Sequence, residues 1–381
     1  MSAPLQPAVF GATGYSGFEL VRLLARHPGA KKPMLVRRNG ESGGYTDLSE
    51  AYPQLLGNGG FPFETLSWQR MKKAGVDVVF FATPPEFSRE LVPEAIAQGF
   101  RVIDLSGAWR LKQAEHRKVY GFNEGQEQGG LDSYAVYGLP ELHSDEIKGA
   151  SLLANPGCYS TSIILALAPW IRAGYVDVEH GIICDSKSGV SGAGKSPTAK
   201  THFVEVNGDF CAYSVFGHRH TGEVLEQLGI GGGSLQFTPH LLPIPRGILS
   251  TIYVNLAKPV TSEELEQALR QFYAGKPWVR VFGAARLPQI KFSLNTNFCD
   301  IGFSLSPDGK RAVLVSCIDN LLKGAAGQAV QNMNLMFGFG EKEGLQGSWL
   351  SKSGVRRSTI KSSSASSPRP FPACGTKVTG W

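Results

Sequence analysis

One cysteine, Cys158, stands where its type and neighbours favour nucleophilic chemistry. It lies in Asn155-Pro156-Gly157-Cys158, between an apolar run that predicts a strand and a run that predicts a helix. The first amides of a helix lack intrahelical partners, and with the helix dipole they stabilise a thiolate and can hold an oxyanion. We therefore expect Cys158 to be a nucleophile. The remaining cysteines fit small buried apolar residues or, for Cys374, a position in the tail: Cys184, Cys211, Cys299, Cys317 and Cys374.

A thiolate that attacks an acyl group needs an acid/base partner, and histidine is the commonest one. Of the eight histidines, only His218 and His220 fall together, in Gly217-His218-Arg219-His220-Thr221-Gly222-Glu223. A pair of this spacing could instead bind a metal, but no further cluster of ligands accompanies it, so we expect no metal site. The pair could also be polar loop residues without a catalytic role.

The segment Gly11-Ala12-Thr13-Gly14-Tyr15-Ser16-Gly17 follows a predicted strand and opens a predicted helix. Glycines in that context let the backbone approach a dinucleotide pyrophosphate, whose charge the helix N-terminus favours. About twenty residues further on, an NAD-binding chain usually offers a carboxylate to the ribose. Here Arg37 and Arg38 occupy that place, and a guanidinium suits a 2'-phosphate, so NADP is preferred over NAD. The alternative is a pair of solvated surface arginines.

Two further segments follow predicted strands. Lys187-Ser188-Gly189-Val190-Ser191-Gly192-Ala193-Gly194-Lys195 is rich in glycine and hydroxyl groups and indicates a phosphate or nicotinamide loop, although its spacing is not that of a nucleoside triphosphate site. Ser106-Gly107-Ala108-Trp109-Arg110 ends a strand with an arginine that could bind a carboxylate or a phosphate.

The elements that position these residues alternate between strand and helix in the first part of the chain. The segments 8–11, 32–38, 76–83, 101–105 and 151–154 are predicted to be strands, and 18–25, 86–98 and 159–168 are predicted to be helices; in 18–25 the apolar residues recur at helical spacing. This alternation predicts a doubly wound parallel sheet of the Rossmann type. Later strands, at 182–186, 235–240, 250–256, 298–305 and 311–317, with a helix at 262–273, predict an α+β catalytic domain with a mixed sheet.

The predicted domains follow from this order. We expect residues 1–154 to form an NADP-binding Rossmann domain, completed by a returning helix within 318–340, and residues 155–317 to form a catalytic and oligomerisation domain. Residues 341–381 contain SSSASSPRP and few aliphatic residues, which predicts a disordered tail. That tail carries seven Lys or Arg against two Glu, and so supplies +5 of the net +6. The nearly neutral remainder argues against nucleic acid as a partner.

The chain has no long apolar run, no basic leader and no paired cysteine motifs, so we expect a cytoplasmic protein that does not enter a membrane. A mixed sheet with an exposed face makes a homodimer or homotetramer plausible as a hypothesis.

Together these segments resemble the N-acetyl-gamma-glutamyl-phosphate reductases, a branch of the aspartate-semialdehyde dehydrogenase group. GATGYSG, SGAWR, YGLPEL, NPGCYST, SGVSGAGK, HRHTGE and NLLKGAAGQAVQNMNLMFG occur in the family's order between about residues 8 and 340. The resemblance implies Cys158 as the nucleophile and His218 as the acid/base, with His220 as the second choice for the acid/base. It implies cofactor contacts from Gly11, Thr13, Gly14, Tyr15, Ser16, Gly17, Ser188, Gly189 and Asn320, and substrate contacts from Arg110, Asn155, His220 and Glu223.

The reaction that this resemblance implies is the NADPH-dependent reduction of N-acetyl-L-glutamyl 5-phosphate, a small acyl phosphate, to the 5-semialdehyde in arginine biosynthesis, through a thioacyl intermediate. A sister enzyme that reduces a carrier-bound aminoadipyl phosphate in lysine biosynthesis would share every catalytic residue named here. A protein of another class, an NADP-binding sensor that has lost the chemistry, should have lost Cys158 or His218, and both are present.

Overall fold

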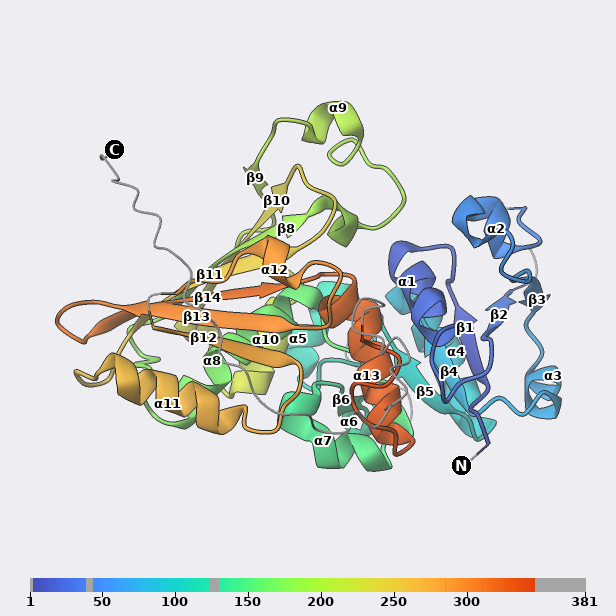
Figure 1. The fold of residues 1–381 in the computed structure, drawn as a ribbon, viewed down its shortest axis with the longest axis horizontal. Coiled ribbons are helices and arrows are strands. Elements are labelled where there is room, and N and C mark those ends of the chain that lie inside the picture. Colours follow the sequence, from blue (N-terminus) through green and yellow to red (C-terminus); the bar gives the residue numbers. More distant parts are fainter. Residues whose placement is uncertain (1–2, 39–43, 123–129, 285, 347–381) are drawn as a thin grey trace, which may run out of the picture. The chain divides into compact units, whose positions relative to one another are not determined.

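The computed structural model describes residues 3–38, 44–122, 130–284 and 286–346. Two seven-stranded sheets organise this part of the chain (Figure 1). We call them the parallel sheet and the mixed sheet.

The parallel sheet has the strand order β3-β2-β1-β4-β5-β7-β6, and each neighbouring pair is parallel. Its first five strands keep the order 3-2-1-4-5 of a Rossmann sheet, which confirms the predicted fold class. The reversal of strand order beside β1 opens a crevice at the carboxyl ends of the strands. The strands are β1 (Pro7–Phe10), β2 (Met34–Arg37), β3 (Phe63–Thr65), β4 (Val78–Phe81), β5 (Arg101–Asp104), β6 (Val136–Tyr137) and β7 (Leu152–Ala154).

Helices cover both faces of the parallel sheet, and this explains why its central strands are apolar throughout. Ala8 and Phe10 of β1 pack in one core with residues of α4 (Pro85–Ala97), whereas Val9 packs on the opposite side with residues of α1 (Tyr15–Leu24). All four residues of β1 and of β4 are buried. Two more helices belong to this part of the chain, α3 (Trp68–Lys73) and α7 (Pro140–Gly149).

The mixed sheet has the order β12-β13-β14-β11-β8-β10-β9, with parallel pairs at β12–β13 and β8–β10 and antiparallel pairs elsewhere. Helices α8 (Cys158–Arg172), α10 (Thr221–Leu228) and α11 (Ser262–Phe272) lie together on one side of it (Figure 1). On the other face Ile183 and Tyr253 are exposed. The strands are β8 (Ile182–Gly189), β9 (Cys211–Ala212), β10 (Leu235–Leu242), β11 (Ile248–Asn255), β12 (Val279–Ala284), β13 (Cys299–Leu305) and β14 (Arg311–Ile318).

After β14 the chain returns to the parallel sheet. A π-helical turn, η5 (Leu322–Ala326), continues into α13 (Gly327–Met336), which lies between the two sheets (Figure 1). The sequence predicts one helix over 320–336; the structure divides it, because the first turn is π-helical. The amide of Asn332 donates to the Gly138 carbonyl at 2.8 Å, and Asn334 Oδ1 lies 2.9 Å from His27 Nε2. Helix α13 is therefore bonded to segments from the first half of the chain.

Most of the elements that the sequence patterns miss have two to four residues and show neither an apolar run nor a period. The equally short strands β1, β2, β4, β5 and β7 are predicted, because their central residues form apolar runs. The short elements that the sequence patterns miss are β3, β6, β9, α2 (Leu48–Ala51), η1 (Pro53–Leu55), α5 (Ala114–Arg117), η2 (Lys118–Tyr120), α6 (Leu131–Tyr134), η3 (Val190–Ala193), α9 (Phe203–Val206), η4 (Gly232–Ser234) and α12 (Ile290–Ser293).

Helix α11 is capped by Thr261, one residue before its first helical residue, and the cap forms a full capping box with Glu264.

Residues 341–346, which we expected to begin the disordered tail, pack against the body. Leu345 is buried, the Glu341 carbonyl accepts a hydrogen bond from the Trp278 indole at 3.1 Å, and the Glu343 carbonyl accepts one from Asn334 at 2.9 Å. The remainder of the predicted tail, 347–381, lies outside the described residues.

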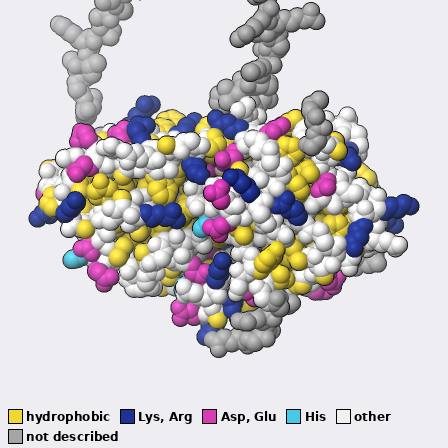
Figure 2. All heavy atoms as spheres, turned by 90° about the horizontal axis from the view of Figure 1, so that it is seen from below, with side chains coloured by type: hydrophobic (Ala, Val, Ile, Leu, Met, Phe, Trp, Pro, Cys, Tyr) yellow, Lys and Arg dark blue, Asp and Glu magenta, His cyan; other side chains and the backbone are white. Residues whose placement is uncertain are grey.

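Surface charge is mixed on the face drawn in Figure 2, where basic and acidic side chains alternate among apolar ones without a broad area of one sign. In the described part of the chain, no helix has both the length and the apolar character needed to cross a membrane.

Candidate active site

Cys158 is the first residue of α8, directly after the Asn155-Pro156-Gly157 turn that follows β7. It is half-buried and faces a cavity of about 1180 Å³. The N-cap residue, Gly157, has no room for a side chain, because a Cβ there would lie 2.5 Å from Nε2 of His220. The strand-turn-helix context that the sequence predicts around Cys158 is therefore present.

Burial raises the pKa of the Cys158 thiol, since a thiolate loses solvation there. The Arg219 guanidinium, the Tyr159 amide and Arg110 act in the opposite direction. Ionisation of Cys158 therefore depends on nearby positive charge, and Arg219 is the group that lowers the pKa of the thiol most.

His218 and His220 precede α10 and lie together, with ring centroids 4.7 Å apart. His218 sits among the aromatic rings of Tyr159, Tyr213 and Phe237, whose centroids lie 5.1–5.7 Å from its own. Burial, reinforced by Arg219, lowers the pKa of His218 to about 4. Burial, reinforced by His218 and two arginines, lowers the pKa of His220 well below its usual value. Both imidazoles are neutral at pH 7.

The hydrogen bonds of His218 define its neutral tautomer. The His220 backbone N–H donates to Nδ1 of His218 at 3.1 Å, so Nδ1 is unprotonated and Nε2 carries the proton. Neutral His218 therefore presents one N–H group at Nε2. His220 is 5% exposed, its Nε2 lies 4.0 Å from Glu223, and its buried Nδ1 has no hydrogen-bond partner within the described part of the chain.

A buried network centred on Glu223 holds the turn that carries Cys158. Glu223 accepts hydrogen bonds from the Gly157 amide at 2.9 Å, the Tyr137 hydroxyl at 2.8 Å and Arg110 at 3.1 Å. Arg110 also donates to the carbonyls of Asn155 and Leu105, both at 2.7 Å. Breaking a buried ion pair of this kind by removing one partner costs about 3–5 kcal/mol, because the remaining charge is left unpaired.

Three of the four residues predicted to contact substrate therefore meet in this network: Arg110, Asn155 and Glu223. Asn155 is fully buried; its amide donates to the Ala325 carbonyl, and its oxygen accepts from Asn332. Of the four, Arg110 and His220 line the cavity.

The glycine turn between β1 and α1 is shaped for close approach of the backbone. Gly11 has φ +78°, and a Cβ there would lie 2.3 Å from the Ala82 carbonyl oxygen, while a Cβ at Gly17 would lie 2.1 Å from the Gly11 carbonyl oxygen. Gly14 is the N-cap of α1, and the Thr13 carbonyl accepts from Tyr52. Gly14, Tyr15, Ser16 and Gly17 line the same cavity as Cys158. One cavity thus joins the glycine turn to Cys158.

The other predicted cofactor residues lie at two places. Arg37 and Arg38 come at the end of β2; Arg37 donates to the Tyr45 carbonyl at 2.7 Å, and Arg38 pairs with Glu90 at 2.6 Å. Neither belongs to the cavity lining. Ser188 and Asn320 do line the cavity, and the Asn320 amide donates to Ser191 Oγ at 3.0 Å. Gly189 lies just behind, where a Cβ would meet the backbone of Arg246 at 2.7 Å.

Sequence reasoning missed two arginines. Arg219 is exposed, lines the cavity and stands between the two histidines in the chain, so its place in the motif was the available signal. Arg246 lies in the loop Pro243-Ile244-Pro245-Arg246-Gly247 between two strands, and nothing in the sequence of this loop indicates which residues Arg246 contacts.

Among the described residues, no group of three or more His, Cys, Asp or Glu side chains is arranged to hold a metal ion.

Comparison with known proteins agrees with this fold. Two models of the semialdehyde dehydrogenase family match the chain, the NAD binding domain over residues 7–150 and the dimerisation domain over residues 158–320. Solved structures with the same fold include aspartate semialdehyde dehydrogenase II from Vibrio cholerae, complexed with ASA, with a TM-score of 0.66 at 18% identity over 88% of this chain and 99% of that one. Another is aspartate semialdehyde dehydrogenase with NADP from Candida albicans, with a TM-score of 0.62 at 15% identity over 88% of this chain and 99% of that one. The chain is thus an oxidoreductase of the semialdehyde dehydrogenase class.

Closer relatives narrow the class. An N-acetyl-gamma-glutamyl-phosphate reductase from Pelotomaculum thermopropionicum is 45% identical over 90% of this chain and 98% of its own length. One from Methanocaldococcus jannaschii is 44% identical over 89% of this chain and 97% of its own length. The chain belongs to the N-acetyl-gamma-glutamyl-phosphate reductase family, as its sequence motifs indicate.

Proposed function

We propose that this protein reduces N-acetyl-L-glutamyl 5-phosphate to N-acetyl-L-glutamate 5-semialdehyde and phosphate, with NADPH as the hydride donor. The observation that carries the proposal is the single cavity that joins Cys158, at the start of α8, to the glycine turn at the start of α1. The family and its relatives support the substrate.

The residues present fit a dinucleotide. At Gly11 and Gly17 a side chain would collide with backbone, and the N-terminus of α1 favours the pyrophosphate. Bound there, the cofactor would supply the hydride. Gly11, Thr13, Gly14, Tyr15, Ser16 and Gly17 would hold its phosphates, and Ser188, Gly189 and Asn320 would lie near the nicotinamide. Arg37 and Arg38 would favour NADP over NAD by binding the 2'-phosphate. To do so, Arg37 would exchange its hydrogen bond to the Tyr45 carbonyl, and Arg38 its ion pair with Glu90, for contacts with the phosphate.

Cys158 would act first. Its thiolate attacks the acyl carbon, a carbon–sulfur bond forms, and the carbon–oxygen bond to phosphate breaks. The resulting thioester accepts hydride, and collapse of the tetrahedral intermediate restores the thiolate and releases the aldehyde. The N-terminus of α8 stabilises negative charge at both stages.

His218 is the proposed acid/base. Its Nε2–H is the group that can donate to the oxygen of the tetrahedral intermediate as hydride arrives, and the hydrogen bond at Nδ1 fixes that orientation of the proton. Arg110, Asn155 and Glu223 would act on substrate through the turn that they hold, and Arg219 and His220 would face the substrate directly, with Arg219 attracting its negative charge.

The proposed domains follow the two sheets. Residues 1–154 with the returning segment 318–340 would form the cofactor domain, and residues 155–317 the catalytic domain. That second domain would associate into a homodimer or homotetramer, which light scattering after size-exclusion chromatography would detect. Its match to a dimerisation domain and the exposed Ile183 and Tyr253 support this association.

A cytoplasmic location is also proposed, in keeping with the free thiols at Cys158, Cys184, Cys211, Cys299 and Cys317.

The direct test is phosphate-dependent reduction of NADP by N-acetyl-glutamate 5-semialdehyde, run beside the Cys158→Ser variant and beside NAD in place of NADP. We expect activity in the parent with NADP and none in the variant, because an alcohol of ordinary pKa is a poor nucleophile here. An inactive parent that still binds NADP would contradict the proposed substrate and direct attention to a carrier-bound aminoadipyl phosphate or to a sensor.

A further inference from the structure

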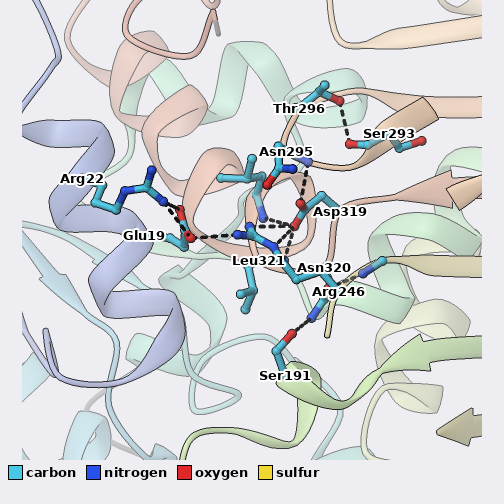
Figure 3. A network of polar contacts seen from close by, with 12 residues as sticks. Glu19, Arg22, Ser191, Arg246, Ser293, Asn295, Thr296, Asp319, Asn320 and Leu321 are labelled. Atoms are coloured by element: carbon cyan, nitrogen blue, oxygen red, sulfur yellow. Dashed lines mark hydrogen bonds and ion pairs between the residues drawn. The ribbon is translucent and has the colours of Figure 1, made fainter. Parts of the chain in front are cut away.

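Arg246 lies where three segments meet (Figure 3). It belongs to the loop between β10 and β11, and its guanidinium reaches in two directions. It donates to Glu19 of α1 at 2.8 Å, and to Asp319, just after β14, at 3.0 Å. Arg22, also on α1, donates to the same Glu19 carboxylate at 3.2 Å. One side chain of the catalytic half of the chain is thus bonded to the helix that begins at the glycine turn.

The charges of this cluster are well removed from water. Asp319 is fully buried and Glu19 is 8% exposed, so each carboxylate depends on its donors. Asp319 also accepts from the backbone amides of Asn295 at 2.8 Å and Leu321 at 2.9 Å, and it therefore fixes the loop from which Asn320 projects. Within the described ranges, loss of Arg246 would leave Glu19 with only Arg22 as a side-chain donor and Asp319 with only backbone donors.

The cluster continues into the wall of the cavity. Asn320 accepts from the Gly247 amide at 2.8 Å and donates to Ser191 at 3.0 Å (Figure 3). The loop of Arg246 binds the same wall, because the Ile244 carbonyl accepts from the Val190 amide at 2.9 Å. Asn320 and Ser191 both line the cavity that Gly14 to Gly17 of the glycine turn also line. Arg246 therefore spans the two structures between which a dinucleotide would extend.

We propose that Arg246, with Glu19 and Asp319, is a positioning residue that sets the separation between the glycine turn and the wall formed by Ser191 and Asn320. A dinucleotide held by its pyrophosphate at α1 and by its nicotinamide at that wall is placed relative to Cys158 by this separation. The inference rests on the proposed function. It implies that steps which use the cofactor depend on Arg246, whereas ionisation and acylation of Cys158 do not.

The test uses the full-length protein with Arg246→Gln, Arg246→Lys and Glu19→Gln. Arg270→Gln is the matched control, because Arg270 pairs with Glu266 on an exposed face of α11. Three quantities are measured: the dissociation constant of NADPH by fluorescence titration, the single-turnover rate of NADPH oxidation, and the rate at which iodoacetamide alkylates Cys158. Glu19→Gln keeps the bond between Arg246 and Asp319, and so provides a milder variant if Arg246→Gln does not fold.

We expect Arg246→Gln and Glu19→Gln to weaken NADPH binding or slow hydride transfer by about 10- to 100-fold, as misplacement of a reacting group does, with alkylation within about twofold of the parent. Arg246→Lys should recover part of the loss, and Arg270→Gln should match the parent. Unchanged NADPH binding and hydride transfer would overturn the proposal, as would an equal loss of alkylation, which would indicate general structural damage. An inactive parent would refute the proposed reaction instead, and the NADPH dissociation constants would still decide whether Arg246 acts on the cofactor.

Discussion

His218 and His220 share a motif but not an environment. His218 lies among aromatic rings and its Nδ1 is used by a backbone donor, whereas His220 is nearly inaccessible and lies over Gly157. The first arrangement suits a group that orients one N–H towards a reacting oxygen. The second suits a group that packs the turn and reaches the cavity with only a small part of its ring.

Substitution separates these roles. We expect His218→Asn to lower kcat by about 10²- to 10⁴-fold, the usual range for loss of an acid/base group, and His220→Asn to lower it less. Steady-state kinetics at saturating substrate, with circular dichroism to confirm folding, provide the measurement. A larger loss of kcat in His220→Asn would assign proton transfer to the second histidine.

At this scale the sequence predicts residue types and neighbours well but not partners. The position of Cys158 on a strand-to-helix turn follows from its local pattern. The hydrogen bonds that Arg110 donates to Asn155, Leu105 and Glu223 do not follow from any local pattern, because these partners lie up to 113 residues away in the chain. Arg219 was overlooked although it lies inside the motif, because its residue type alone does not separate an arginine that faces a cavity from any other surface arginine.

Among the elements, the π-helical turn η5 packs directly against Cys158. A Cβ at Gly324 would be 2.7 Å from Cβ of Cys158, and isolated π-turns are frequent at functional sites. Gly324→Ala should therefore displace Cys158 or the turn, at a stability cost of about 1–3 kcal/mol, and lower both kcat and the alkylation rate of the thiol. Enzyme assays and iodoacetamide kinetics measure the two effects.

Gly149 is the matched control, because it ends α7 and an added Cβ would meet nothing within 4 Å. Gly149→Ala should retain the activity of the parent. If Gly324→Ala also retained both activity and thiol reactivity, the close packing of η5 on α8 would have no functional role.

The sequence predicts the elements that have an apolar run or a helical period, such as β4, α4 and α8. It misses α3, α7, α10 and β12, which have six to ten residues. Boundaries differ by one to three residues at most of these ends, as in β8, where the expected strand 182–186 continues to Gly189. The π-turn could not be expected, because nothing in the types of Leu322 to Ala326 separates a π-turn from an α-helix. Gly324 is the one weak helix former among them, and its close contact with Cys158 is seen only in the structure.

For the whole molecule, several buried histidines link stability to pH. Burial lowers the pKa of His27, His218 and His220, and for His218 the value is about 4 against an ordinary 6.5. Between about pH 4 and 6.5 the unfolded chain therefore binds more protons than the folded one. The free energy of unfolding should fall as the pH is lowered through this range, by on the order of 1 kcal/mol per pH unit for each such histidine.

Urea unfolding at pH 7, 6 and 5 tests this expectation. The slope should be reduced in His218→Asn, because one of the linked groups is removed. Equal unfolding free energies at pH 7 and 5 in the parent would show that these histidines are protonated in the folded protein.

The return of α13 to the parallel sheet has a consequence for biosynthesis. The carbonyl of Gly138 and the ring of His27 find their partners in Asn332 and Asn334, about 190 to 310 residues later in the chain. While a ribosome is still adding the mixed sheet, the first sheet has been made but lacks the helix that covers part of it. Its apolar surface stays open until residue 336 has left the exit tunnel, so the cofactor-binding half is among the first parts synthesised and the last to be completed.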